Sequence, residues 1–79
     1  MSTLASAAIG QSVRIAKAEL EEDIAAWLAA VGLAEGEELV VLRRAAFGGP
    51  LHVRLATGGE FAVAREIAQK LSVDAGAPK

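Results

Sequence analysis

The sequence predicts a small, mainly β domain: a partly closed barrel of five short strands, with one longer helix capping an opening. Two patterns indicate these elements. Apolar and polar residues alternate in several short segments, as is typical of strands, and one stretch between them has apolar residues at helical spacing. Five short strands would leave unpaired edges unless the sheet curled on itself, which favours a barrel.

Length and composition indicate a single globular domain over residues 1–79. Hydrophobic residues make up 53% of the chain and charged residues 23%, which is typical of folded rather than disordered proteins. Much of the apolar fraction is alanine, and a chain of this size buries only roughly 60% of its unfolded surface. We therefore expect a small core, with residues 1–8 and 74–79 flexible.

Charge and cysteine content narrow the location and the partners. The chain has no cysteine, so nothing requires an oxidising compartment, and we expect a cytoplasmic protein. No basic leader precedes Ala5-Ser6-Ala7, and charged residues interrupt every apolar run, so neither a signal peptide nor membrane insertion is expected. Nucleic-acid-binding proteins usually carry a surface patch rich in Lys and Arg. The net charge of -2 therefore argues against binding to nucleic acid.

Two β-hairpins that share a middle strand are predicted within residues 38–63. Leu39–Leu42 is an unbroken apolar run, typical of a strand covered on both faces. A turn at Phe47–Pro50 follows, and apolar residues then alternate with polar ones over Leu51–Leu55. This middle strand should therefore turn one face to the core and the other to solvent.

The register of the second hairpin can also be predicted. A Thr-Gly-Gly turn separates Leu55 from the returning strand, which starts at Glu60. Pairing Leu55 with Glu60 would place a carboxylate on the apolar face. A three-residue loop would instead pair Leu55 with Phe61 and Val53 with Val63, so one face would stay apolar.

A helix is predicted between a first strand at residues 13–17 and the hairpins. From residue 18 onward one apolar stripe recurs at helical spacing, made of Leu20, Ile24, Trp27, Leu28 and Val31. Acidic residues at 19–23 suit the positive end of a helix dipole, and Gly32 lies where a left-handed C-cap is expected. We expect Leu20, Ile24, Leu28 and Val31 to pack on the core, and Trp27 to be buried there at least in part. Residues 64–69 predict a short helix and 71–73 a last strand.

Three segments carry a resemblance to a known family: Val31-Gly32-Leu33 followed by Gly36, the run LVVLRRAAFGGPLHV at 39–53, and FAVAREIAQKLSV at 61–73. In order and spacing these residues resemble the ferrous iron transport protein A (FeoA) family, small cytosolic bacterial proteins with an SH3-like barrel. The resemblance covers about residues 9–73.

The chain departs from the family pattern at four positions. The family usually has Pro at the positions of Glu35 and Ala46, Asp at Gly49 and Arg at Ala64. Each of these departures affects a turn or a typical contact rather than the barrel.

The resemblance implies an accessory protein, not an enzyme, that binds the cytosolic GTPase-containing part of a bacterial ferrous-iron transporter. Two alternatives stay open: a metal-responsive sensor of iron or manganese, and a stand-alone oligomerising module. The chain has a single histidine, His52, and no second one that could activate a serine or threonine as a nucleophile. This agrees with a non-catalytic role. Short edge strands and a modest core predict a monomer or weak homodimer.

The candidate partner-binding residues are Phe47, Gly48, Gly49 and Pro50. An aromatic residue at an exposed turn is difficult to bury, so Phe47 is the expected anchor for the partner. In the alternative interpretation, its ring folds back over the mouth of the barrel and completes the core.

The candidate metal ligands are His52, the single histidine, and Glu60 on the same outward face. A divalent site normally needs three or four ligands. We therefore expect no resident cofactor, and at most weak Fe(II) binding or a site shared between two molecules.

Overall fold

The computed structural model describes residues 2–75 of the chain. In chain order its elements are β1 (Ser2–Thr3), a 3-10 helix (Leu4–Ser6), β2 (Ser12–Ala18), α1 (Glu22–Ala30), β3 (Glu38–Arg44), β4 (Leu51–Leu55), β5 (Glu60–Val63), α2 (Arg65–Ala68) and β6 (Leu71–Ala75). The mainly β fold with one longer helix is confirmed. None of the described helices is long and apolar enough to cross a bilayer.

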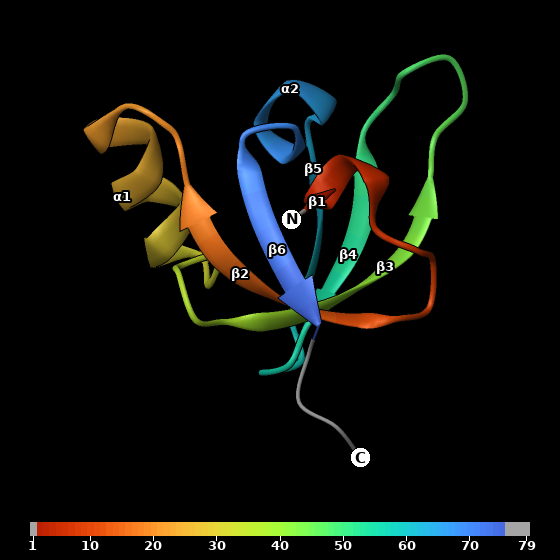
Figure 1. The fold of residues 1–79 in the computed structure, drawn as a ribbon, viewed down its shortest axis with the longest axis horizontal. Helices are drawn as coiled ribbons and strands as arrows, with labels where there is room; N and C mark the ends of the chain where they lie inside the picture. The colour runs from red at the N-terminus through yellow and green to blue at the C-terminus, as the bar shows by residue number, and fades with distance from the viewer. Residues whose placement is uncertain (1, 76–79) are drawn as a thin grey trace.

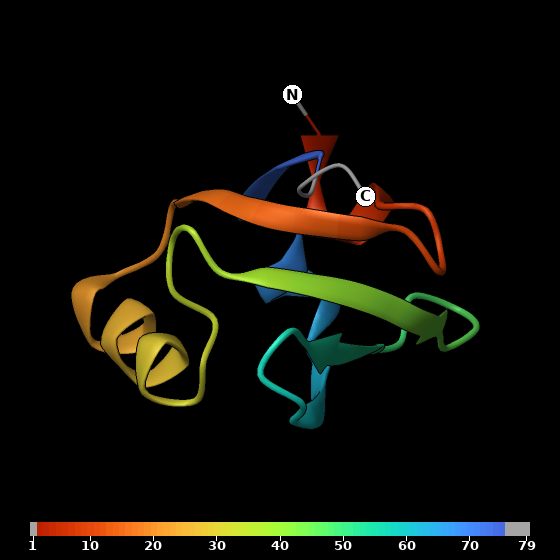
Figure 2. The same cartoon turned by 90° about the horizontal axis from the view of Figure 1, so that it is seen from below.

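The strands form one antiparallel sheet in the order β1-β6-β2-β3-β4-β5, which curls around a shared interior (Figures 1 and 2). The predicted number of five strands was wrong, because β1 is too short to show an alternating pattern. The barrel is only partly closed, as predicted: in the described part of the chain no pairing joins the edge strands β1 and β5. This curled architecture is SH3-like.

The N-terminal segment belongs to the core, so the prediction of flexibility was wrong for residues 2–7. Ser2 pairs with Val73 of β6, and Leu4 is completely buried. The segment lacks strand or helix periodicity because it changes from β1 to a 3-10 helix within five residues. At the other end Asp74 and Ala75 complete β6, and residues 76–79 lie outside the described residues.

The second hairpin has a different register from the predicted one. Val53 pairs with Phe61, and Leu51 pairs with Val63, so β5 is shifted by two residues relative to the prediction. A shift of two keeps every side chain on its expected face, which is why the apolar pattern alone could not distinguish the two registers. The observed register places Arg54 opposite Glu60, and these two side chains form an ion pair.

The core is built mostly from one face of the sheet. Its members from the two predicted hairpins are Leu39, Val41, Leu51, Val53, Leu55 and Val63, with Phe61 partly buried against them. Val40 and Leu42 are only half-buried, so β3 is not covered on both faces as expected. The apolar run of β3 therefore contributes alternate residues to the interior.

Helix α1 packs less of its surface than the sequence predicts. It begins at Glu22, and of the apolar stripe only Leu28 is buried, whereas Trp27 is 60% exposed. The helix lies beside one end of the sheet (Figure 2), where only one side meets the core. Gly32 then takes a φ of +106°, and Leu33 follows it into the interior. The predicted packing is confirmed for Leu20 and Leu28 and was wrong for the exposed Ile24, Trp27 and Val31. The C-cap prediction is confirmed.

Candidate partner-binding site

The loop between β3 and β4 presents an aromatic ring to solvent. Phe47 is fully exposed, at 107% of its reference area, so the alternative in which its ring closes the core was wrong. Its φ of +60° is the only positive value among the described non-glycine residues, and Gly48 follows with a φ of +76°. The loop projects past the ends of the strands (Figure 1).

Backbone hydrogen bonds close this loop at its base. Ala45 N donates to Pro50 O at 3.0 Å, and Gly49 N donates to Ala46 O at 3.2 Å. Gly48 stands close to α2, since a Cβ built on it would lie 3.7 Å from Cδ of Arg65. The four predicted partner-binding residues therefore lie together on one internally bonded loop.

A β-bulge in β3 decides which side chains share the outer face below this loop. Val41 pairs with Val53, but Arg43 pairs with His52, so Leu42 is the extra residue. The bulge places Arg43 beside His52 on the outer face. Arg44 turns to the other side, where its Nε donates to the carbonyl oxygen of Ala5 at 3.1 Å.

Glu60 is shared by two side chains of β4. His52 Nε2 lies 3.2 Å from Glu60 Oε1, and Arg54 Nη2 lies 3.0 Å from Glu60 Oε2. Arg54 Nε also donates to Oε2, at 3.2 Å. The hydrogen bonding from Arg54 is the main cause that lowers the pKa of Glu60 below 4.5, and the charges of Arg54 and His52 act in the same direction.

The two predicted metal ligands thus lie in direct contact, but they do not form a metal centre by themselves. No group of three or more His, Cys, Asp or Glu side chains with suitable geometry exists among the described residues. Arg54 also places a positive charge on the carboxylate that would bind the ion. A divalent ion at this position would need further ligands from a second molecule.

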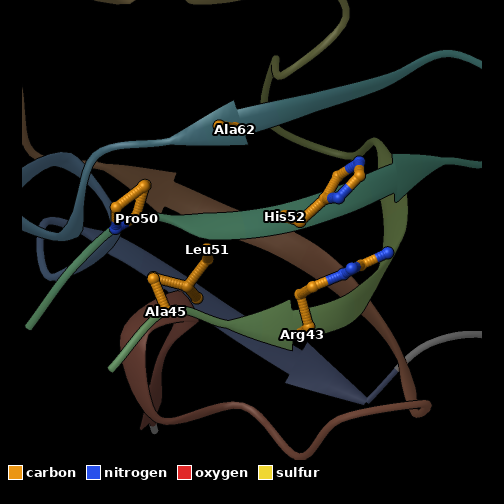
Figure 3. A pocket seen from close by; sticks show the side chains of 6 residues that line it. All are labelled: Arg43, Ala45, Pro50, Leu51, His52 and Ala62. Carbon is orange, nitrogen blue, oxygen red and sulfur yellow. The ribbon is translucent and has the colours of Figure 1, made fainter. Parts of the chain in front are cut away.

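A groove of about 350 Å³ lies on the outer face next to the loop. It is lined by Arg43, Ala45, Pro50, Leu51, His52 and Ala62 (Figure 3). The sequence did not predict Arg43 and Ala62 as site residues. The groove depends on the bulge at Leu42 and on the register of β5, and no residue type in the sequence marks either feature.

Comparison with protein-family models shows which family the chain belongs to. The FeoA domain model matches residues 2–75. This chain belongs to the FeoA family. The family is associated with ferrous iron transport, and its domain is an SH3-like accessory domain. Among curated protein sequences, none matches the chain significantly.

Solved FeoA structures share the fold. FeoA from Chlorobium tepidum is 25% identical, with a TM-score of 0.84 over 95% of this chain and 70% of its own. Stenotrophomonas maltophilia FeoA, an SH3 domain protein complexed with zinc, is 26% identical, with a TM-score of 0.74 over 94% of this chain and 91% of its own. Iron(II) transport protein A from Clostridium thermocellum has the same fold at 20% identity and a TM-score of 0.83, covering 92% of this chain. The chain spans only 44% of the length of that protein.

Two departures from the usual FeoA pattern have structural counterparts here. At Gly49, where the family usually has Asp, a Cβ would lie 2.6 Å from Cβ of Ala45, so the loop closes more tightly than a side chain allows. At Glu35, where Pro is usual, the carboxylate accepts a hydrogen bond from the backbone N–H of Ala18 at 3.2 Å. Glu35 therefore ties the α1–β3 connection to the end of β2.

Proposed function

We propose that this FeoA-family chain is a regulatory accessory protein of a bacterial ferrous-iron transport system. In this proposal it works in the cytoplasm as a binding protein rather than an enzyme. Its partner is the cytosolic, GTPase-containing part of the transporter, and Phe47 is the anchor of the contact. The observation that carries the proposal is the complete exposure of Phe47.

The geometry of the loop suits a binding anchor. A phenyl ring in water forgoes a large burial energy, and a positive φ adds backbone strain, so this conformation has no evident benefit to the isolated fold. Aromatic anchors of this kind dominate many protein interfaces. The backbone hydrogen bonds at the loop base fix the loop before binding, which reduces the backbone entropy lost on association.

Calorimetry with the isolated cytosolic domain of the transporter tests the proposal. Phe47→Ser should weaken binding by about 1 kcal/mol or more, the scale of a hot-spot truncation, while leaving the melting curve almost unchanged. Trp27→Ser is the matched control, because Trp27 is the other strongly exposed aromatic residue and lies on α1. Unchanged affinity in a folded Phe47→Ser protein, or no binding by the wild type, would refute the proposal.

Metal sensing is the second candidate function, and one observation favours it. His52 and Glu60 already lie 3.2 Å apart, and the similar S. maltophilia FeoA is complexed with zinc. Titration of the chain with Fe(II) or Mn(II) at micromolar protein concentration separates this function from the first. Saturable binding that is lost in His52→Gln would support a sensor. The absence of any heat of binding would contradict the sensor and would leave the accessory role as the one candidate function.

The proposed assembly state is a monomer or weak homodimer. Light scattering over a range of concentrations checks it. A higher oligomer of fixed size at every concentration would contradict it and would favour the oligomerising module instead.

A further inference from the structure

The outer face of β3, β4 and β5 carries one guanidinium group, that of Arg43, which pairs with no carboxylate of residues 2–75. Arg43, His52 and Arg54 share this face with two carboxylates: Glu60, which Arg54 and His52 contact, and Glu38, which pairs with Arg14 of β2. Among residues 2–75 the guanidinium of Arg43 forms no hydrogen bond and no ion pair. The face therefore holds a cation that is free to bind a ligand.

The groove beside Arg43 has an apolar interior with polar groups at one end. Ala45, Pro50 and Ala62 supply the apolar surface, next to the completely buried Leu51. Figure 3 shows Pro50 and Ala45 towards one end and the side chains of Arg43 and His52 standing at the other. With its Nε2 on Glu60, His52 has no partner for Nδ1 within the described part of the chain.

We propose that this groove binds a short peptide segment in which an apolar side chain lies next to an Asp or Glu. The apolar side chain would fill the space between Pro50 and Ala62, and the carboxylate would bind Arg43 with support from His52. This inference rests on the proposed function, since the segment is assigned to the cytosolic part of the transporter. The groove includes Ala45 and Pro50 at the base of the Phe47 loop, so one partner can cover both.

Charge decides between this ligand and others. A wholly apolar segment would cover the guanidinium of Arg43 without pairing it, which is unfavourable, and a basic segment would be repelled. A phosphate group would satisfy Arg43 but would leave the apolar surface of the groove unused. An acidic and apolar segment is the one class that matches both ends, with a fork of guanidinium N–H groups suited to a carboxylate.

An NMR titration of the full chain tests the groove without the transporter. The probes are two capped pentapeptides, acetyl-Ala-Leu-Asp-Leu-Ala-amide and its Asn counterpart, with inorganic phosphate as a third probe. The Asp peptide should shift the amide signals of Arg43, His52 and Ala62 and bind about fivefold more tightly than the Asn peptide, the upper end expected for an accessible ion pair. Arg43→Gln should remove this preference. Lys70→Gln, which deletes a cation outside the groove, should keep it.

Equal affinity for both peptides would overturn the inference, and so would signal changes confined to other faces. Phosphate binding as strong as that of the Asp peptide would also overturn it, because the apolar part of the ligand would then contribute nothing.

A second arm uses the cytosolic domain of the transporter. Ala62→Trp, which fills the groove, and Arg43→Gln should both weaken binding about fivefold, the scale of a single interface residue. If Phe47→Ser weakens binding but these two variants do not, the groove is not part of the interface and the inference fails. If the wild type does not bind the domain although the peptide preference is present, the proposed function fails and the groove specificity stands.

Discussion

Arg44 Nε donates a hydrogen bond to the carbonyl oxygen of Ala5 at 3.1 Å, and this contact joins the end of β3 to the N-terminal segment. The bulge at Leu42 makes it possible, because it turns Arg44 away from the outer face that Arg43 occupies. One extra residue in a strand thus supplies both a structural clamp and an exposed cation.

Arg44→Met should destabilise the protein by about 1 kcal/mol, since it removes a partly buried, charge-assisted hydrogen bond. Urea unfolding measures the loss, and amide exchange at Ala7 should accelerate with it. Arg43→Met is the control, because its guanidinium makes no bond within residues 2–75. Equal stability of the two variants would show that the contact with Ala5 contributes nothing.

Leu4→Ala should lower the free energy of unfolding by about 3 kcal/mol, because a completely buried leucine leaves a cavity when truncated. Thermal unfolding followed by circular dichroism measures this change. Ile9→Ala is the control at a residue that is 55% exposed, and it should have a small effect. A small effect of Leu4→Ala would mean that residues 2–7 are flexible, as predicted from the sequence.

Val53→Ala should cost about 2 kcal/mol, because Val53 is completely buried at the centre of β4. The melting temperature should fall by about 4–8 °C for each kcal/mol lost in a domain of this size. Val40→Ala, at a half-buried position of β3, should have a smaller effect. Reversal of this order would mean that the strand faces are assigned wrongly.

Gly32→Ala should be more harmful than Gly10→Ala, although both glycines have a positive φ. A Cβ at residue 32 would lie 2.6 Å from Cδ1 of Leu55, whereas a Cβ at residue 10 would meet nothing within 4 Å. Each change costs roughly 1 kcal/mol for the left-handed backbone, and the first adds a steric clash. Denaturant unfolding of the pair isolates the clash, and equal losses would refute it.

Arg54→Gln should raise the pKa of Glu60 towards 4.5, because it removes the hydrogen bond that lowers it. A depressed pKa in the folded state stabilises the fold above pH 4.5, and this contribution disappears as the pH falls through the folded pKa. The variant should therefore show a flatter dependence of stability on pH below 4.5. Carboxyl ¹³C titration of Glu60 checks the shift directly, and an unchanged titration curve would contradict it.

The elements with strong local signals could be predicted from sequence, and the contacts between them could not. Alternation identified Leu51, Val53 and Leu55 as core residues, and Gly32 marked the end of α1. The register of β5 was wrong because a shift of two residues leaves the apolar pattern unchanged. Trp27 was expected to be at least partly buried because it has helical spacing from other apolar residues, yet Leu28 is the one buried residue of α1.

The candidate site was predicted in part. The exposed loop at Phe47 and the shared outer face of His52 and Glu60 follow from turn residues and strand parity. The contact between His52 and Glu60 depends on the register of β5, which was not predicted correctly. Arg43 was missed because an extra residue in β3 leaves no mark in a run of apolar and basic residues. Leu4 was missed because a short strand followed by a 3-10 helix has no period to detect.

The position of β6 in the sheet has a consequence for synthesis on the ribosome. This strand lies between β1 and β2, so the first strand of the chain has no neighbour until residues 71–75 are available. A nascent chain ending before Leu71 can form the β3–β4–β5 hairpins, but one side of β2 is unpaired and the 3-10 helix that carries Leu4 lacks one of its neighbours. Because β6 pairs with both β1 and β2, the domain can complete its fold only after this last strand has left the exit tunnel. A truncation before Leu71 therefore removes a strand from inside the sheet rather than an unpaired C-terminal segment.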